Sequence, residues 1–182
     1  MFCGIDLGSR AVKLVLLDGE EIREEKVIET ARFYKKCGEH TPAGFAINID
    51  ALLSCHPTAM AVTGYGRNSL DIVGAEILSE LKAHMLGALW QTGLTDFTLL
   101  DLGGQDSKVI RVRSSRMDDF LLNDKCAAST GRYLENMAAV LDISLDELSR
   151  HFVDPVELSA TCAIFGESEL IGRIVEGVPI PI

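Results

Sequence analysis

The sequence of 182 residues has few aromatic side chains, no long hydrophobic run and no excess of basic residues. No apolar run approaches the roughly 18–20 residues that a membrane-spanning helix needs. The 17 basic and 27 acidic side chains give a formal net charge of −10, which argues against broad contact with nucleic acid or anionic lipid. We therefore expect neither nucleic acid nor a membrane as a partner. Apolar residues still make up 47% of the chain, which is enough to bury a core and excludes a disordered tail.

Several sequence signatures are also missing. The five cysteines form no C-x-x-C pair, and strand-like sequence follows Met1 directly, without a basic leader. We therefore expect a cytoplasmic protein whose thiols stay free, react or bind metal rather than form disulfides. The sequence has no G-x-x-x-x-G-K-[ST] motif, and Gly64-Tyr65-Gly66 lacks the third glycine of a dinucleotide fingerprint. These absences exclude P-loop proteins and disfavour a Rossmann-type site.

One short motif occurs twice. Asp6-Leu7-Gly8-Ser9 is followed by Lys13, and Asp101-Leu102-Gly103-Gly104 is followed by Lys108, in both cases seven residues after the aspartate. Apolar residues flank both motifs, so each predicts a β-hairpin whose glycine turn carries a carboxylate. We infer a duplication, with a first subdomain at residues 1–95 and a second at residues 96–182. The alternative is a chance similarity between two common turns.

The rest of the sequence alternates between strand-like and helical patterns. Strands are expected at residues 20–29, after the turn Asp18-Gly19, and at residues 58–63. Apolar periodicity and capping residues predict helices over residues 71–91, 129–141, 144–152 and 167–175, and a short helix within residues 42–54. Strands followed by helices place the chain in the α/β class.

The two glycine turns are candidate phosphate sites, because glycine lets backbone N–H groups approach phosphate oxygens. A carboxylate at a strand end can hold Mg²⁺ through water, so Asp6 and Asp101 are candidate catalytic and magnesium-binding residues. Gln105 is a further candidate catalytic residue, because it could orient an attacking water. The candidate nucleotide-binding residues are Gly8, Ser9, Lys13, Gly103, Gly104, Gln105, Asp106 and Lys108. Two such turns facing each other could hold the β- and γ-phosphates of ATP; the plainer interpretation is two ordinary β-turns.

Two of the cysteines differ from the other three. Cys126 and Cys162 each precede a predicted helix, where the helix dipole stabilises a thiolate. A two-fold dimer could bring four such thiolates together around an iron–sulfur cluster on its axis. The alternative is that both are small buried hydrophobic residues, and the spacing leaves both possibilities open. For Cys3, Cys37 and Cys55 we expect that structural role.

Several segments together resemble one known family. They are residues 4–9 with Lys13, residues 63–67, residues 101–108, residues 123–128 with residues 130–132, and Cys162 with Phe165 and residues 167–169. The set resembles the ATP-dependent activators, or activases, of 2-hydroxyacyl-CoA dehydratases, which form the BadF/BadG/BcrA/BcrD-type ATPase family. The resemblance covers nearly the whole chain and is weakest over residues 31–56. The N-D-K-C-A-A segment and the second cysteine segment are specific to the activase branch.

This resemblance implies a fold, cofactors and partners. The fold is the actin-like, sugar-kinase-like (ribonuclease H-like) ATPase fold with two related subdomains. The cofactors are ATP, Mg²⁺ and one [4Fe–4S] cluster per homodimer, with Cys126 and Cys162 of each subunit as cluster ligands. Reduced ferredoxin or flavodoxin is the implied electron donor. ATP binding and hydrolysis would drive an electron into a 2-hydroxyacyl-CoA dehydratase or a benzoyl-CoA reductase-like partner.

The sequence departs from the family pattern in two places. Ser129 stands where the family usually has glycine, and the sequence stops before the family's glycine-rich adenosine-binding segment. We therefore expect the second subdomain to be incomplete. Two alternative functions remain: a shortened, non-catalytic relative that binds a cluster or a partner, and a small-molecule kinase of the same superfamily.

Overall fold

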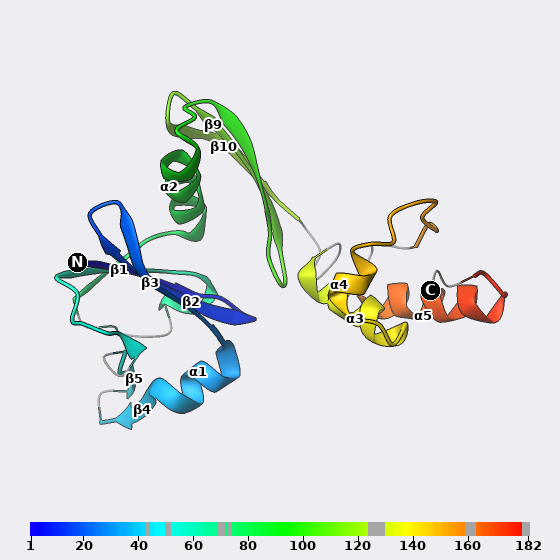
Figure 1. Cartoon of the computed structure of the whole chain (residues 1–182), viewed down its shortest axis with the longest axis horizontal. Helices are drawn as coiled ribbons and strands as arrows, with labels where there is room; N and C mark the ends of the chain where they lie inside the picture. Colours follow the sequence, from blue (N-terminus) through cyan, green and yellow to red (C-terminus); the bar gives the residue numbers. More distant parts are fainter. Residues whose placement is uncertain are drawn as a thin grey trace. The chain divides into compact units, whose positions relative to one another are not determined.

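The computed structural model describes residues 1–42, 44–49, 52–68, 72, 74–123, 130–158 and 163–179. The chain separates into two compact units, Met1–Gly93 and Leu94–Ile182, each of which is described by itself. Both units contain helices and strands (Figure 1), so the α/β class is confirmed. None of the helices described is long and apolar enough to cross a membrane.

The first unit is built on a five-stranded sheet in the order β3-β2-β1-β6-β7. Its strands are β1 (Phe2–Leu7), β2 (Ala11–Asp18), β3 (Glu21–Glu29), β6 (Ala59–Thr63) and β7 (Ala75–Ile77). β1 and β2 form an antiparallel hairpin, whereas β6 lies parallel to β1 on its other edge. β1 is therefore paired on both sides at the centre of the sheet.

The core of this unit lies on one face of the sheet. Alternate side chains of β1 point to that face, and among them Ile5 and Leu7 are 2% and 1% exposed. The helix α1 (Thr30–Cys37) supplies Phe33, which is fully buried, to the same core cluster. Asp6 alternates with these residues and so lies on the opposite face.

Shorter elements complete the first unit. The hairpin of β4 (Gly38–Thr41) and β5 (Gly44–Ile47) follows α1 directly (Figure 1). A 3₁₀ helix (Tyr65–Asn68) follows β6. The helix α2 (Glu80–Thr92) begins after Ser79, whose side chain accepts a hydrogen bond from a backbone N–H of the first turn.

The second unit begins with the same order of elements as the first unit. The strands β8 (Phe97–Leu102), β9 (Ser107–Arg113) and β10 (Arg116–Leu122) form an antiparallel sheet in the order β10-β9-β8. The helix α3 (Gly131–Val140) comes next, so three strands and a helix follow one another as in β1-β2-β3-α1. This shared order supports the predicted relation between the two halves.

Within the described part of the second unit, α3 is followed by two further helices. The short α4 (Leu145–Leu148) begins after Ser144, which accepts a hydrogen bond from the Glu147 N–H as its predicted capping role requires. The helix α5 (Ala163–Val175) packs closely on α3. The close approach is evident at Gly166, where a Cβ would lie 2.5 Å from the Tyr133 hydroxyl. A larger residue at position 166 would therefore require the Tyr133 ring to move.

Some of the predicted elements are wrong. Residues 44–47 form β5 rather than part of a helix, and the His40 and Phe45 rings contact each other across this hairpin. The helix expected over residues 71–91 begins only at Glu80, because the preceding β7 pairs with β6 in the sheet. The sequence pattern did not predict α1. The predicted strand at residues 20–29, the strand at residues 58–63 and the helix at residues 129–141 are confirmed as β3, β6 and α3, with small shifts in their ends.

Candidate functional site

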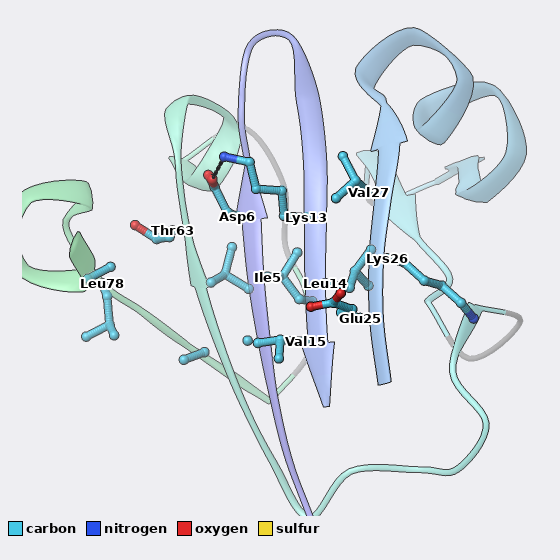
Figure 2. Close-up of a pocket in the computed structure, with 14 residues that line it drawn as sticks. Ile5, Asp6, Lys13, Leu14, Val15, Glu25, Lys26, Val27, Thr63 and Leu78 are labelled. Atoms are coloured by element: carbon cyan, nitrogen blue, oxygen red, sulfur yellow. Dashed lines mark hydrogen bonds and ion pairs between the residues drawn. The ribbon is translucent and has the colours of Figure 1, made fainter. Parts of the chain in front are cut away.

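The first glycine turn joins β1 to β2. Asp6 and Lys13 are register partners in this hairpin, so the seven-residue spacing is the spacing of a cross-strand pair. Lys13 Nζ lies 3.0 Å from Asp6 Oδ2 in an ion pair drawn as a dashed line in Figure 2. The pair stands on the sheet face opposite the core. Gly8 and Ser9 lie between the two strands, at the turn itself.

The second glycine turn joins β8 to β9 and reproduces this pairing. Asp101 and Lys108 are again register partners, with Lys108 Nζ 3.2 Å from Asp101 Oδ2. Lys108 Nζ also lies 3.0 Å from Asp106 Oδ1, so one ammonium group holds two carboxylates. Gly103, Gly104 and Gln105 fill the turn between the strands.

Backbone geometry at the two turns is also alike. A Cβ on Gly8 would lie 2.5 Å from the Ala11 carbonyl oxygen, and one on Gly103 would lie 2.9 Å from the Asp106 carbonyl oxygen. Both contacts are with the residue three positions further along the chain. Any larger residue at either glycine would therefore force the turn open.

Each turn is also held by a threonine at the start of a helix. The Thr30 hydroxyl, at the first residue of α1, donates to the Gly8 carbonyl oxygen at 2.8 Å. The Thr130 hydroxyl, directly before α3, donates to the Gly104 carbonyl oxygen at 3.2 Å, and Thr130 is 1% exposed. Neither threonine was predicted as a functional residue from its sequence motif. The signal in the sequence that could have identified them is a threonine that follows the third strand in each half.

A cavity of about 420 Å³ opens on the Asp6 face of the first sheet. It is lined by side chains of β1, β2, β3 and β6, with Leu78 and Ala83 from the following segment. In Figure 2, Lys13 reaches towards Asp6 at one end of the cavity, and Thr63 lies on the neighbouring strand. The cavity therefore extends from the acid–lysine pair along the sheet.

Gly64 brings the chain after β6 against this pair. Its φ angle is +91°, and a Cβ there would lie 2.4 Å from Asp6 Oδ1 and 2.7 Å from the backbone of Leu7. Only glycine permits this conformation and this approach together. The Gly64-Tyr65-Gly66 motif is therefore a packing feature of the first turn.

Three of the five cysteines lie within the described residues. Cys3 and Cys37 are buried in the first core, and burial raises the pKa of both thiols. Cys55 is half-buried and packs against the same cluster. The expected role as a small buried residue is confirmed for Cys3 and Cys37, whereas Cys55 is only partly buried. Cys126 and Cys162 lie outside the described residues, although α5 begins at Ala163, directly after Cys162.

The first turn fits a hydrated cation. Lys13 occupies one oxygen of the Asp6 carboxylate, and the other, Oδ1, is buried without a hydrogen-bond partner among the described residues. An ionised carboxylate only accepts hydrogen bonds, so Oδ1 suits a metal ion or a metal-bound water. Glycine turns beside such a group expose the backbone N–H groups that phosphate oxygens need.

The family model of the BadF/BadG/BcrA/BcrD ATPase family matches residues 3–178. The chain belongs to this family. It is similar to the (R)-2-hydroxyglutaryl-CoA dehydratase activating ATPase of Acidaminococcus fermentans, with 38% identity over 96% of this chain and 67% of the relative. It is also similar to the activator of lactoyl-CoA dehydratase of Anaerotignum propionicum, with 37% identity over 96% of this chain and 68% of the relative.

A solved structure agrees with this assignment. The activator of the 2-hydroxyisocaproyl-CoA dehydratase from Clostridium difficile, with bound ADPNP, superposes with a TM-score of 0.77. Its sequence is 33% identical, and the alignment covers 97% of this chain and 66% of that structure. The chain thus spans about two thirds of the length of these relatives. The resemblance drawn from the motifs is confirmed, and so is the activator-ATPase fold.

Proposed function

We propose that the protein is an ATP-dependent electron-transfer activator of a 2-hydroxyacyl-CoA dehydratase or benzoyl-CoA reductase-like component. The observation that carries this proposal is the acid–lysine pair built twice, each time beside a glycine turn. Membership of an ATPase family whose similar members include dehydratase activators supports it. The similar structure with bound ADPNP supports nucleotide binding.

Each turn has a distinct part in this proposal. Gly8, Ser9 and Lys13 bind phosphate oxygens at the first turn, and Gly103, Gly104 and Lys108 do so at the second. Asp6 and Asp101 each hold a water of hydrated Mg²⁺. Mg²⁺, when bound, would supply positive charge that neutralises the phosphate oxygens. Gln105 orients the attacking water and Asp106 keeps Lys108 in place.

The electron-transfer part rests on the two cysteine motifs. Cys126 and Cys162 of both subunits of a homodimer hold one [4Fe–4S] cluster, which carries single electrons when bound. The backbone N–H groups at the start of α5 lie next to Cys162 in sequence and favour a negatively charged ligand set. Ferredoxin or flavodoxin supplies the electron and the dehydratase component receives it in the cytoplasm.

The proposal is tested on anaerobically purified protein by measuring ATP hydrolysis and iron together. We expect Mg²⁺-dependent hydrolysis and about four iron atoms per dimer. Asp101→Asn should lower the hydrolysis rate on the order of 100-fold, because it removes a charged group at the site of reaction. Asp96→Asn is the matched control, since Asp96 accepts hydrogen bonds from Thr95 and Ser114 near the opposite end of the sheet.

The cysteine assignment has its own variants. Cys126→Ser should remove the iron and leave folding intact, whereas Cys55→Ser should keep the iron. Retention of iron by Cys126→Ser would contradict the ligand assignment. Iron without hydrolysis would support the shortened, non-catalytic relative. Iron-free protein that phosphorylates a small molecule would support the kinase alternative.

A further inference from the structure

Two buried oxygen atoms on neighbouring strands have no hydrogen-bond partner among the described residues. They are Asp6 Oδ1 at the end of β1 and Thr63 Oγ1 at the end of β6. A buried oxygen left unpaired costs about 1–3 kcal/mol, so folded proteins rarely keep one without a use. Two such atoms on paired residues of neighbouring strands indicate that a ligand group normally pairs with them.

The sheet brings these two residues together. Asp6 and Thr63 are register partners in the parallel pairing of β1 and β6, and both line the cavity that Lys13 also lines. Lys13 already occupies Asp6 Oδ2, which leaves Oδ1 as the acceptor without a partner among the described residues. Figure 2 shows Thr63 on the strand beside Asp6.

The local backbone keeps this arrangement in place. Gly64 follows Thr63 directly, and its missing side chain is what lets Asp6 Oδ1 stay where it is, because a Cβ would lie 2.4 Å away. Gly66 packs in the same way against Leu7 and the Tyr34 hydroxyl. The segment after β6 is therefore shaped around the Asp6 carboxylate.

The chemistry of the pair selects the group that it binds. An ionised carboxylate only accepts hydrogen bonds, whereas a hydroxyl can both donate and accept. A water molecule can donate one hydrogen to each of these oxygens. A water bound to Mg²⁺ is polarised by the cation, which strengthens both bonds.

We infer that Thr63 is a positioning residue of the nucleotide site, whose Oγ1 joins Asp6 Oδ1 in holding a water of the hydrated magnesium ion. This inference rests on the proposed function and adds a residue of β6 to the two glycine turns. Thr63 fixes the position of the magnesium-bound water relative to Asp6 of the first turn. Thr63 acts through this water alone.

The test is calorimetric binding of a non-hydrolysable ATP analogue to the full protein over a series of Mg²⁺ concentrations. Thr63→Val keeps the shape and removes the hydroxyl, and it should raise the Mg²⁺ concentration needed for half-maximal binding about tenfold. Thr63→Ser should stay close to the wild type. Binding in EDTA should be the same for all three proteins.

A stability measurement separates this role from a purely structural one. Without ligand, Thr63→Val should be at least as stable as the wild type, because the substitution removes an unpaired buried hydroxyl. Thr30→Val is the contrast, since its hydroxyl is already bonded to Gly8, and it should lower the melting temperature. A less stable Thr63→Val with unchanged Mg²⁺ dependence would mean an ordinary structural water and would overturn the inference.

Further outcomes are also decisive. If the wild type binds the analogue and Thr63→Val has the same Mg²⁺ dependence, the inference fails and the proposed function stands. If the wild type binds no nucleotide at any Mg²⁺ concentration, the proposed function fails. Should Thr63→Val not fold, Thr63→Ala takes its place, with the buried neighbour Val62→Ala as the control for lost packing.

Discussion

The two glycine turns have the same backbone geometry and the same strand register, yet the number and the burial of their charged side chains differ. The Lys13 side chain is 59% exposed and pairs with one carboxylate, whereas the Lys108 side chain is 4% exposed and holds two. Asp106 supplies the extra carboxylate, at the position that Ala11 occupies in the first turn. The first turn is thus the more cationic of the two, and the second has more acceptors for ordering water. The two turns thus have the same acid–lysine pairing in different electrostatic surroundings.

A second difference lies in the apolar face of the two hairpins. Ile5 and Leu7 of β1 are 2% and 1% exposed, whereas the equivalent Leu100 and Leu102 of β8 are 60% and 61% exposed. β1 is paired on both edges, but β8 pairs only with β9 among the described residues. The same strand pattern is therefore a core strand in one unit and an exposed apolar strand in the other.

The largest expected effect tests this difference directly. Ile5→Ala should lower the free energy of unfolding by about 2–5 kcal/mol, because it leaves a cavity in the first core. Leu100→Ala should change it by less than about 0.5 kcal/mol, because that side chain is mostly exposed. Urea denaturation measures both. Equal losses in the two variants would show that another part of the molecule covers β8.

A smaller effect is expected from the two lysines. Lys108→Met should cost about 1–3 kcal/mol, because it leaves Asp101 and Asp106 without their shared partner. Lys13→Met should cost at most about 1 kcal/mol, because an exposed ion pair is screened by water. Thermal and urea unfolding of both variants provides the comparison. A larger loss of unfolding free energy for Lys13→Met than for Lys108→Met would contradict the prediction that the second ion pair contributes more to stability.

The smallest effect concerns acid. Lys26 and Ser54 hydrogen-bond to the Glu24 carboxylate and lower its pKa from 4.5 to about 2. A lowered pKa means that the stabilisation is complete above pH 4.5 and is lost as the pH falls to about 2. The difference in unfolding free energy between wild type and Glu24→Gln should therefore shrink over that range.

The acid prediction also has a counterpart in the second unit. Hydrogen bonds from the Thr95 hydroxyl and the Ser114 N–H lower the pKa of Asp96 below 3.8, so Asp96→Asn should behave in the same direction. Glu25→Gln is the matched control for the first unit, because Glu25 alternates with Glu24 along β3 and lines the cavity on the other face. A pH-independent difference for Glu24→Gln would contradict the assigned hydrogen bonds.

The sequence alone determined the parts of this protein that depend on neighbouring residues. Both hairpins, the acid–lysine register pairs and the Ser144 cap follow from local spacing, because turn geometry fixes which residues face each other. The motifs also identified the family. The helix predicted within residues 42–54 does not include residues 44–47, because pairing of β4 with β5 outweighed local preference there.

Only the tertiary structure decided the contacts between distant segments. The parallel pairing of β1 with β6 sets Thr63 beside Asp6, and the starts of α1 and α3 tie Thr30 and Thr130 to the glycine turns. No local spacing encodes such contacts, because they form only when the intervening chain closes a loop and packs. The contrasting burial of Lys13 and Lys108 has the same origin, since their local sequences are alike and their surroundings are not.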